Sequence, residues 1–131
     1  MSSDVNARLE LARALRESAD GSSEVALRAA LSRSYYSIFH AAEVLLGKVT
    51  HENIVKRLGA IDPELAAKVK KLRQVRSQAD YDPGFVEREF KGNLEQFRLD
   101  VRQQVDEGLA VYNRILSEIE RDPRGLRFGS D

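Results

Sequence analysis

Arg33 and His40 are the first side chains in this sequence that could do chemistry together, and they lie seven positions apart. No helix breaker separates them, and this spacing makes two turns of an α-helix, so both would lie on one face, about 10 Å apart. An imidazole can act as a general base near neutral pH, and a guanidinium can stabilise charge on a phosphate. The pair could therefore cleave RNA without a metal, or hold a phosphate or a ribose hydroxyl. The alternative is a half-buried structural histidine and a salt-bridged surface arginine.

A second polar group, Arg76, Asp80 and Tyr81, lies at the end of a later predicted helix. Arg76 falls on the inward stripe of that helix, and Asp80 follows it by one turn. A charge on an inward stripe is costly unless it is paired, so we expect an ion pair between Arg76 and Asp80. Tyr81 immediately precedes a loop and could cover a pocket. The group is either a clamp on the helix end or part of a pocket for an anionic or nucleotide-like ligand.

The composition and the missing motifs narrow the remaining chemistry. The 131 residues contain 21 Lys+Arg, 21 Asp+Glu and no Cys. Duplex-DNA binders usually carry a basic surplus, which is absent here. The basic residues between positions 68 and 76 fan around the predicted helix, which is typical of a solvated face. The sequence has no paired-histidine motif, P-loop, dinucleotide-binding glycine pattern or nucleophile elbow. We therefore expect no metal and no cofactor.

The stretch from Leu31 to Leu46 is the element that must position the first pair, and at 100° per residue it has two stripes. The first is an ordinary core stripe: Leu27, Leu31, Tyr35, Ile38, Ala42 and Leu45. The second combines small, aromatic and titratable residues: Ala29, Arg33, Tyr36, His40 and Val44. A surface helix would carry Lys and Glu there. We predict that the bundle covers the first stripe, and that the second meets a partner subunit or lines a groove.

The remaining signals predict an all-α fold, an up-and-down four-helix bundle with an additional short helix. Ser22 or Ser23 can cap the central helix, and Asp62-Pro63-Glu64 is a strong helix start. Gly92 and Gly108 fall inside the last helix, where each costs about 1 kcal/mol against Ala and could cause a kink. The predicted helices run from Ser3 or Asp4 to Gly21, over 24–46, over 51–58, from 63 to the loop at 82–84, and over 86–120.

The chain is short enough to form one domain, and we assign residues 1–122 to a single bundle and 123–131 to a flexible tail. The N-terminus lacks a basic region followed by an apolar run, so no signal peptide is expected. No apolar stretch approaches the length of a membrane span. We expect a cytoplasmic protein.

Two motifs in this order resemble the HEPN domain, and the similarity covers roughly Val25 to the end of the last helix. The first is Arg33-Ser-Tyr-Tyr-Ser-Ile-Phe-His40-Ala-Ala, followed by His51, and the second is Arg76-Ser-Gln-Ala-Asp-Tyr81. The resemblance implies an up-and-down bundle of four to five helices, a homodimer, and pairing with a minimal nucleotidyltransferase in toxin–antitoxin-like operons. Many HEPN relatives are metal-independent ribonucleases in which an arginine precedes a histidine on a late helix. Here no histidine follows Arg76, and Arg33 with His40 is the only pair at suitable spacing.

We therefore expect an HEPN-type nucleotide- or nucleic-acid-associated module, partner of a nucleotidyltransferase-like protein and not itself an enzyme. One alternative is a metal-independent ribonuclease that uses Arg33 and His40 on single-stranded RNA. The other is a non-catalytic dimeric protein-interaction module. The candidate ligand-binding residues are Arg33, Tyr36, His40, Arg76, Asp80 and Tyr81.

Overall fold

The computed structural model describes residues 11, 13, 14, 16, 17 and 23–121. Within these residues every regular element is an α-helix, which confirms the predicted all-α class. Three of the described helices are long and two are short: α2 (Glu24–Leu46), α3 (Ile54–Gly59), α4 (Pro63–Tyr81), α5 (Phe85–Phe90) and α6 (Leu94–Arg121). The predicted first helix lies mostly outside the described residues, and the predicted tail lies outside them.

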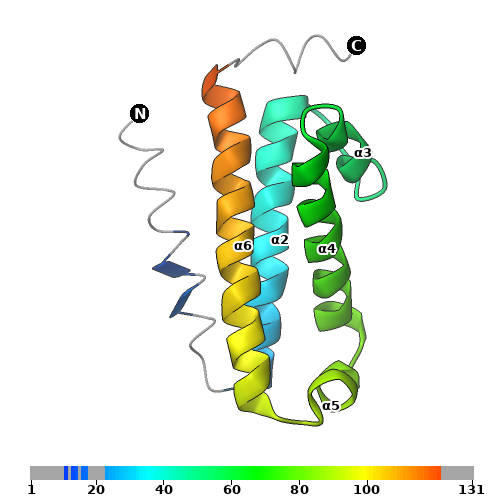
Figure 1. The fold of residues 1–131 in the computed structure, drawn as a ribbon, viewed down its shortest axis with the longest axis vertical. Coiled ribbons are helices and arrows are strands. Elements are labelled where there is room, and N and C mark those ends of the chain that lie inside the picture. The colour runs from blue at the N-terminus through cyan, green and yellow to red at the C-terminus, as the bar shows by residue number, and fades with distance from the viewer. Residues whose placement is uncertain (1–10, 12, 15, 18–22, 122–131) are drawn as a thin grey trace.

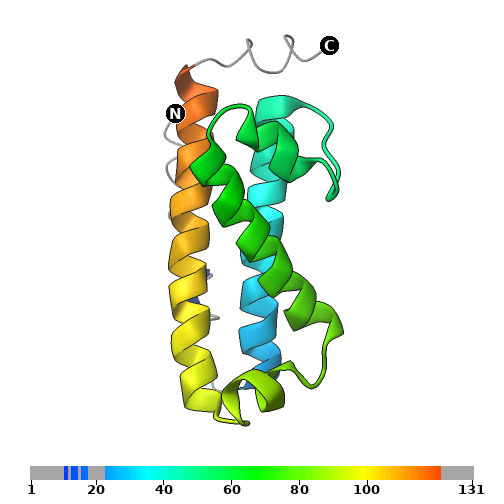
Figure 2. The same cartoon turned by 45° about the vertical axis from the view of Figure 1, so that its right-hand side comes forward.

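The helix α2 is the centre of the bundle. It lies between α6 and α4 in Figure 1, and its most extensive contacts are with these two helices. The chain runs up α2, down α4 and up α6, so α2 and α6 are parallel neighbours. Figure 2 shows α3 at one end of the bundle and α5 at the other. None of these described helices combines the length and apolarity that a membrane crossing requires.

The boundaries of α2 and α4 agree with the capping signals in the sequence. Ser23 caps α2 through its side chain, and Asp62 caps α4, with Pro63 as the first helical residue. These caps satisfy backbone N–H groups that have no partner inside the helix. The two helices end at Leu46 and Tyr81, immediately before the glycine and the loop that predicted their ends.

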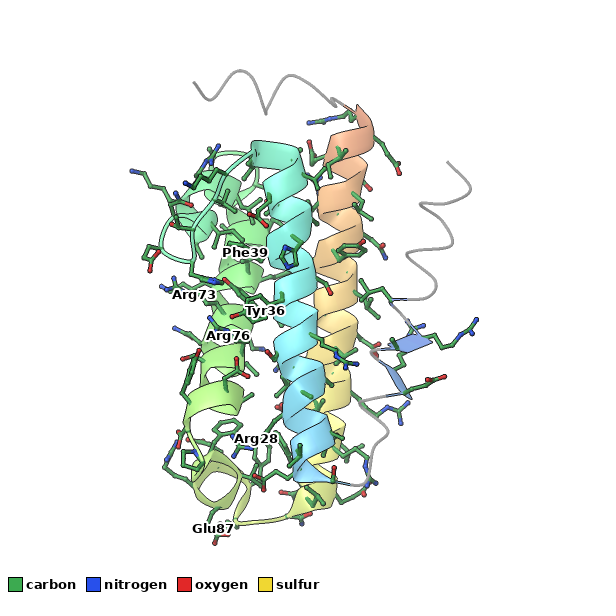
Figure 3. The ribbon with its side chains drawn as sticks, turned by 180° about the vertical axis from the view of Figure 1, so that it is seen from behind. Arg28, Tyr36, Phe39, Arg73, Arg76 and Glu87 are labelled. Carbon is green, nitrogen blue, oxygen red and sulfur yellow. The ribbon has the colours of Figure 1, made fainter. Side chains whose placement is uncertain are left out.

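Two arginines fasten the C-terminal ends of α2 and α4. Arg28 donates to carbonyls at the end of α4 and in the following loop, including those of Ala79 and Asp82, both at 2.9 Å (Figure 3). Arg57 of α3 donates to the carbonyl of Leu46 at 2.8 Å. The carbonyls of Ala79 and Leu46 lie in the last turns of α4 and α2 and have no intrahelical donor, so the charged donors stabilise both helix ends. As a result α4 is fixed against α2, and the loop after α2 is held in place.

The prediction of one continuous helix over 86–120 was wrong. The chain forms the short α5, and then turns through Lys91 (φ 53°) and Gly92 (φ 74°) before α6 begins at Leu94. Left-handed backbone cannot continue a right-handed helix, and glycine adopts it without steric cost. Gly92 therefore lies in a turn between two helices, not inside one.

Gly108 does lie inside α6, and its role is close packing against α2. A Cβ atom at this position would lie 2.0 Å from Ser34 Oγ, far inside van der Waals contact. Ser34 is itself buried on α2. The missing side chain lets the two parallel helices approach, which offsets the cost of a glycine in a helix. On either side of this contact the core divides into an upper cluster with α3 and a lower cluster with α5.

Candidate functional site

Arg76 is the centre of the most unusual group of side chains in the described part of the chain. It lies on the inward side of α4 and is only 7% exposed. Its guanidinium carbon lies 5.0 Å from the ring centroid of Tyr35, 5.3 Å from that of Tyr36 and 5.9 Å from that of Tyr81. Ring faces attract cations, and the attraction grows when water is excluded. A buried cation is therefore surrounded mainly by aromatic rings.

The predicted ion pair between Arg76 and Asp80 is confirmed, with a nitrogen–oxygen distance of 3.6 Å. The same Asp80 carboxylate accepts a hydrogen bond from Ser32 of α2 at 3.3 Å, so its charge is shared between two donors. Arg76 also donates to the Tyr36 hydroxyl at 3.5 Å, and its Nε has no hydrogen-bond partner among the described residues. The guanidinium is thus only partly compensated, because one loose carboxylate faces five N–H donors.

His51 joins this group from the loop after α2. The short helix predicted over 51–58 begins three residues later than expected, at Ile54, and His51 lies in the turn before it. Reciprocal hydrogen bonds between Thr50 and Asn53 shape this turn. The imidazole stacks on Phe39 with a centroid distance of 4.5 Å, and its Nδ1 lies 2.8 Å from the Tyr35 hydroxyl. The turn therefore presents the imidazole to α2 at a defined position.

The surroundings of His51 favour its neutral form. Burial lowers the pKa of His51, and the charges of Arg76 and Arg73 lower it further. Burial also raises the pKa of Tyr35, so the phenol keeps its proton. A neutral imidazole can accept a proton or a hydrogen bond, as a base or a ligand-binding group must.

Arg73 adds a second positive charge to the same side of the molecule. It precedes Arg76 by one turn on α4 and is half-buried. Figure 3 shows Arg73 and Arg76 of α4 facing Tyr36 and Phe39 of α2 along the line where the two helices meet. We call the whole group the α2–α4 cluster: Tyr35, Tyr36, Phe39, His51, Arg73, Arg76, Asp80 and Tyr81.

The predicted site residues divide between this cluster and another side of α2. Tyr36, Arg76, Asp80 and Tyr81 belong to the cluster, although Tyr81 is 73% exposed at its edge. The others lie on what we call the open flank of α2, which is the exposed side formed by Ala29, Arg33, His40 and Val44. There the His40 side chain is 72% exposed and pairs with Glu43 at 3.0 Å. The structure thus separates Arg33 and His40 from Arg76.

Sequence reasoning missed four members of the cluster: Tyr35, Phe39, His51 and Arg73. Tyr35 belongs to the apolar stripe of α2 and was predicted to be an ordinary core residue. Arg73 was included among the solvated basic residues, and Phe39 and His51 appeared in the segments that resemble HEPN proteins without being assigned to a site. The one available signal was the order of the motifs, because His51 falls between the two segments that resemble HEPN proteins.

The described residues of the cluster include no metal-binding group, and one cavity of the bundle lies apart from them. The described residues contain no group of three or more His, Asp or Glu side chains that could hold a metal ion. A cavity of about 300 Å³ lies elsewhere, between the first turn of α4 and α6. Three of its four charged lining residues are already paired, Arg114 with Asp62 at 3.7 Å and Lys68 with Glu107 at 3.8 Å. The charges that line the cavity therefore do not indicate which class of ligand it would bind.

Comparison with known proteins does not assign the chain to a family. No family model, no curated protein and no solved structure matches the chain. The chemistry that the cluster can support is anion binding, since it combines two arginines, a neutral histidine and exposed aromatic surface.

Proposed function

We propose that this chain is an HEPN-type module that binds the phosphate of a nucleotide or of single-stranded nucleic acid at the α2–α4 cluster. The segments that resemble HEPN proteins are the ones that contribute Tyr35, Tyr36, His51, Arg76 and Asp80 to the cluster. Residues from three separate parts of the sequence thus meet around one cation. This convergence supports a binding role for the motifs beyond helix packing.

The observation that carries the proposal is the incomplete compensation of Arg76. Burying a charge is costly, and its one carboxylate partner is 3.6 Å away and shared with Ser32. Arg73 lies one turn away, and residues three apart on a helix face the same side. Arginines bind phosphate oxygens in forked geometry, and such charge-assisted hydrogen bonds are about twice as strong as neutral ones. An anion next to Arg73 would offset the charge of both residues.

Tyr81 supplies a surface on which a nucleobase can stack. Its side chain is exposed, while its ring lies 5.9 Å from the Arg76 guanidinium. Stacking of a base on an aromatic side chain contributes about 1–3 kcal/mol and tolerates any base. A ligand that placed a phosphate at the arginines and a base on Tyr81 would have the size of a nucleotide.

The protein partner that we propose is a minimal nucleotidyltransferase, as the HEPN resemblance implies, with a second copy of this chain as the other subunit. The open flank of α2 is the surface that supports this part of the proposal. Val44 is 52% exposed there, next to Arg33 and His40. An exposed valine beside an arginine fits such a surface, because arginine is enriched in protein interfaces.

The test is a calorimetric titration with AMP, ATP and a short single-stranded RNA. Arg73→Gln and Arg33→Gln are matched variants, because each removes one arginine charge from a different side of the bundle. We expect Arg73→Gln to weaken AMP binding at least about tenfold, since a charge-assisted hydrogen bond contributes about 1.5–3 kcal/mol. Arg33→Gln should change the affinity less than about twofold.

Two results would contradict the proposal. Absence of binding by all three ligands to the wild-type chain would remove the nucleotide-binding role. A larger loss in Arg33→Gln would move the site to the open flank, and equal losses would show that binding is not specific to the cluster.

A further inference from the structure

His51 lies where a bound anion would change its protonation. Its ring contacts Phe39 and the Tyr35 hydroxyl, while Arg73 and Arg76 act on it from α4. The carboxylates that act on it are Glu52 in the same turn and Glu43 of α2, and both have weaker effects than the arginines. Glu43 is also paired with His40 at 3.0 Å. In the free protein, burial and positive charge together therefore oppose protonation of His51.

The hydrogen bond to Tyr35 can persist in both protonation states. With a neutral imidazole that carries its proton on Nε2, the Tyr35 hydroxyl donates to Nδ1, 2.8 Å away. With a charged imidazole, Nδ1 carries a proton and donates to the hydroxyl oxygen. Tyr35 needs to change only the direction of its O–H bond, because burial keeps the phenol protonated. Protonation of His51 thus requires no movement of heavy atoms.

We infer that His51 is a proton-linked anion ligand: when a phosphate or sulfate group binds next to Arg73 and Arg76, His51 takes up a proton and joins the arginines in binding it. This inference rests on the proposed anion site, and it adds that pH regulates binding there. A bound anion cancels the arginine charge that opposes protonation, and its own charge favours the imidazolium. Linkage is reciprocal, so ligand affinity must rise as the pH falls. For one proton the rise is at most about tenfold per pH unit.

Inorganic sulfate is the probe, because it stays doubly charged from about pH 5 to about pH 8. A phosphate monoester is less suitable, since its own pKa of about 6 lies in the same range. Sulfate affinity would be measured at constant ionic strength at about pH 7.5, 6.5 and 5.5, where histidine titrates. NMR of the His40→Gln variant would follow His51 directly, because it is then the only histidine of the chain.

We expect tighter sulfate binding at each lower pH and a higher His51 pKa in saturating sulfate. The His51→Gln variant keeps a hydrogen-bonding side chain but cannot titrate. Whatever its affinity at about pH 7.5, sulfate binding by this variant should no longer tighten as the pH falls. A purely structural histidine would not produce this difference.

The possible failures are distinguishable. If sulfate binds equally well at all three pH values, or if the His51→Gln variant keeps the full pH dependence, the inference is wrong and the anion site remains. If neither sulfate nor AMP binds at any pH, both the inference and the proposed function are wrong.

Discussion

An arginine and a histidine lie next to each of two adjoining sides of α2, and the two pairs differ in origin, burial and neighbouring residues. On the open flank, Arg33 and His40 come from α2 itself and are exposed. In the α2–α4 cluster, Arg76 comes from α4 and His51 from a loop, and both pack against tyrosines of α2. The comparison teaches that residue types and helical spacing identify candidates, while burial and neighbours decide their chemistry.

The two histidines illustrate the difference in electrostatic setting. His40 has a carboxylate partner and a hydrated side chain, so its interactions are weakened by water and salt. His51 has no carboxylate in hydrogen-bond contact among the described residues and faces two arginines. We therefore expect the second setting, and not the first, to couple the protonation of a histidine to the binding of an anion.

The largest effect should separate the two arginines in stability. Arg76→Ala removes a buried guanidinium from between aromatic rings, so we expect the free energy of unfolding to fall by about 3 kcal/mol. Arg33→Ala should change it by less than about 0.5 kcal/mol, because the side chain is exposed. Urea unfolding followed by circular dichroism measures both values.

Arg76→Met serves as the control for packing. It restores most of the lost volume without the charge, and we expect it to recover part of the stability lost in Arg76→Ala. If all three variants were as stable as the wild type, Arg76 would not be held as the structure describes. A loss in Arg33→Ala as large as that in Arg76→Ala would abolish the distinction between the two sides.

Much of the fold is predictable from local signals. Ser23 and Asp62 cap the starts of α2 and α4, and the glycine after Leu46 ends α2. Each of these boundaries is set by residues adjacent to it in the sequence. The break before α6 is not predictable in this way, because apolar residues continue at helical spacing through the turn at Lys91. Nor does the sequence reveal that Gly108 serves packing, since its neighbour Ser34 is distant in the chain.

The site was predictable only where it follows a helical period. The Arg76–Asp80 ion pair follows from a charge on an inward stripe with an acid one turn later. The position of His51 follows from no period, because a loop residue reaches its partners through the tertiary fold alone. Tyr35 was correctly expected to be buried, but nothing in its stripe indicates that its hydroxyl bonds to an imidazole.

A smaller effect should distinguish the histidines through the pH dependence of stability. The pKa of His51 is lower in the folded protein than its ordinary value of 6.5, so the unfolded chain binds more protons as the pH falls below that value. Stability should therefore be greatest above about pH 6.5 and decrease as the pH falls toward the folded-state pKa. Urea unfolding between about pH 7.5 and 5.5 measures the slope, above the range where most carboxylates titrate.

The slope should be reduced in His51→Gln, which has no titratable group at this position. His40→Gln provides the same substitution on the open flank. If the slope survived in His51→Gln and disappeared in His40→Gln, the pH dependence would come from the open flank, and this prediction would be wrong.

The smallest effects are expected from the double variant Arg33→Ala/His40→Ala. Both side chains are exposed, and the contact of His40 with the cluster is an edge-on one with Phe39, at a ring-centroid distance of 6.0 Å. The free energy of unfolding should therefore stay within about 0.5 kcal/mol of the wild type. AMP affinity should also be unchanged within about twofold. Single-stranded RNA incubated in EDTA with either protein should remain equally intact, because two hydrated side chains of this kind lack the desolvated surroundings that strengthen electrostatic catalysis. EDTA-resistant cleavage by the wild type that disappeared in the double variant would contradict this, since it would make the exposed pair the active one and the buried pair structural.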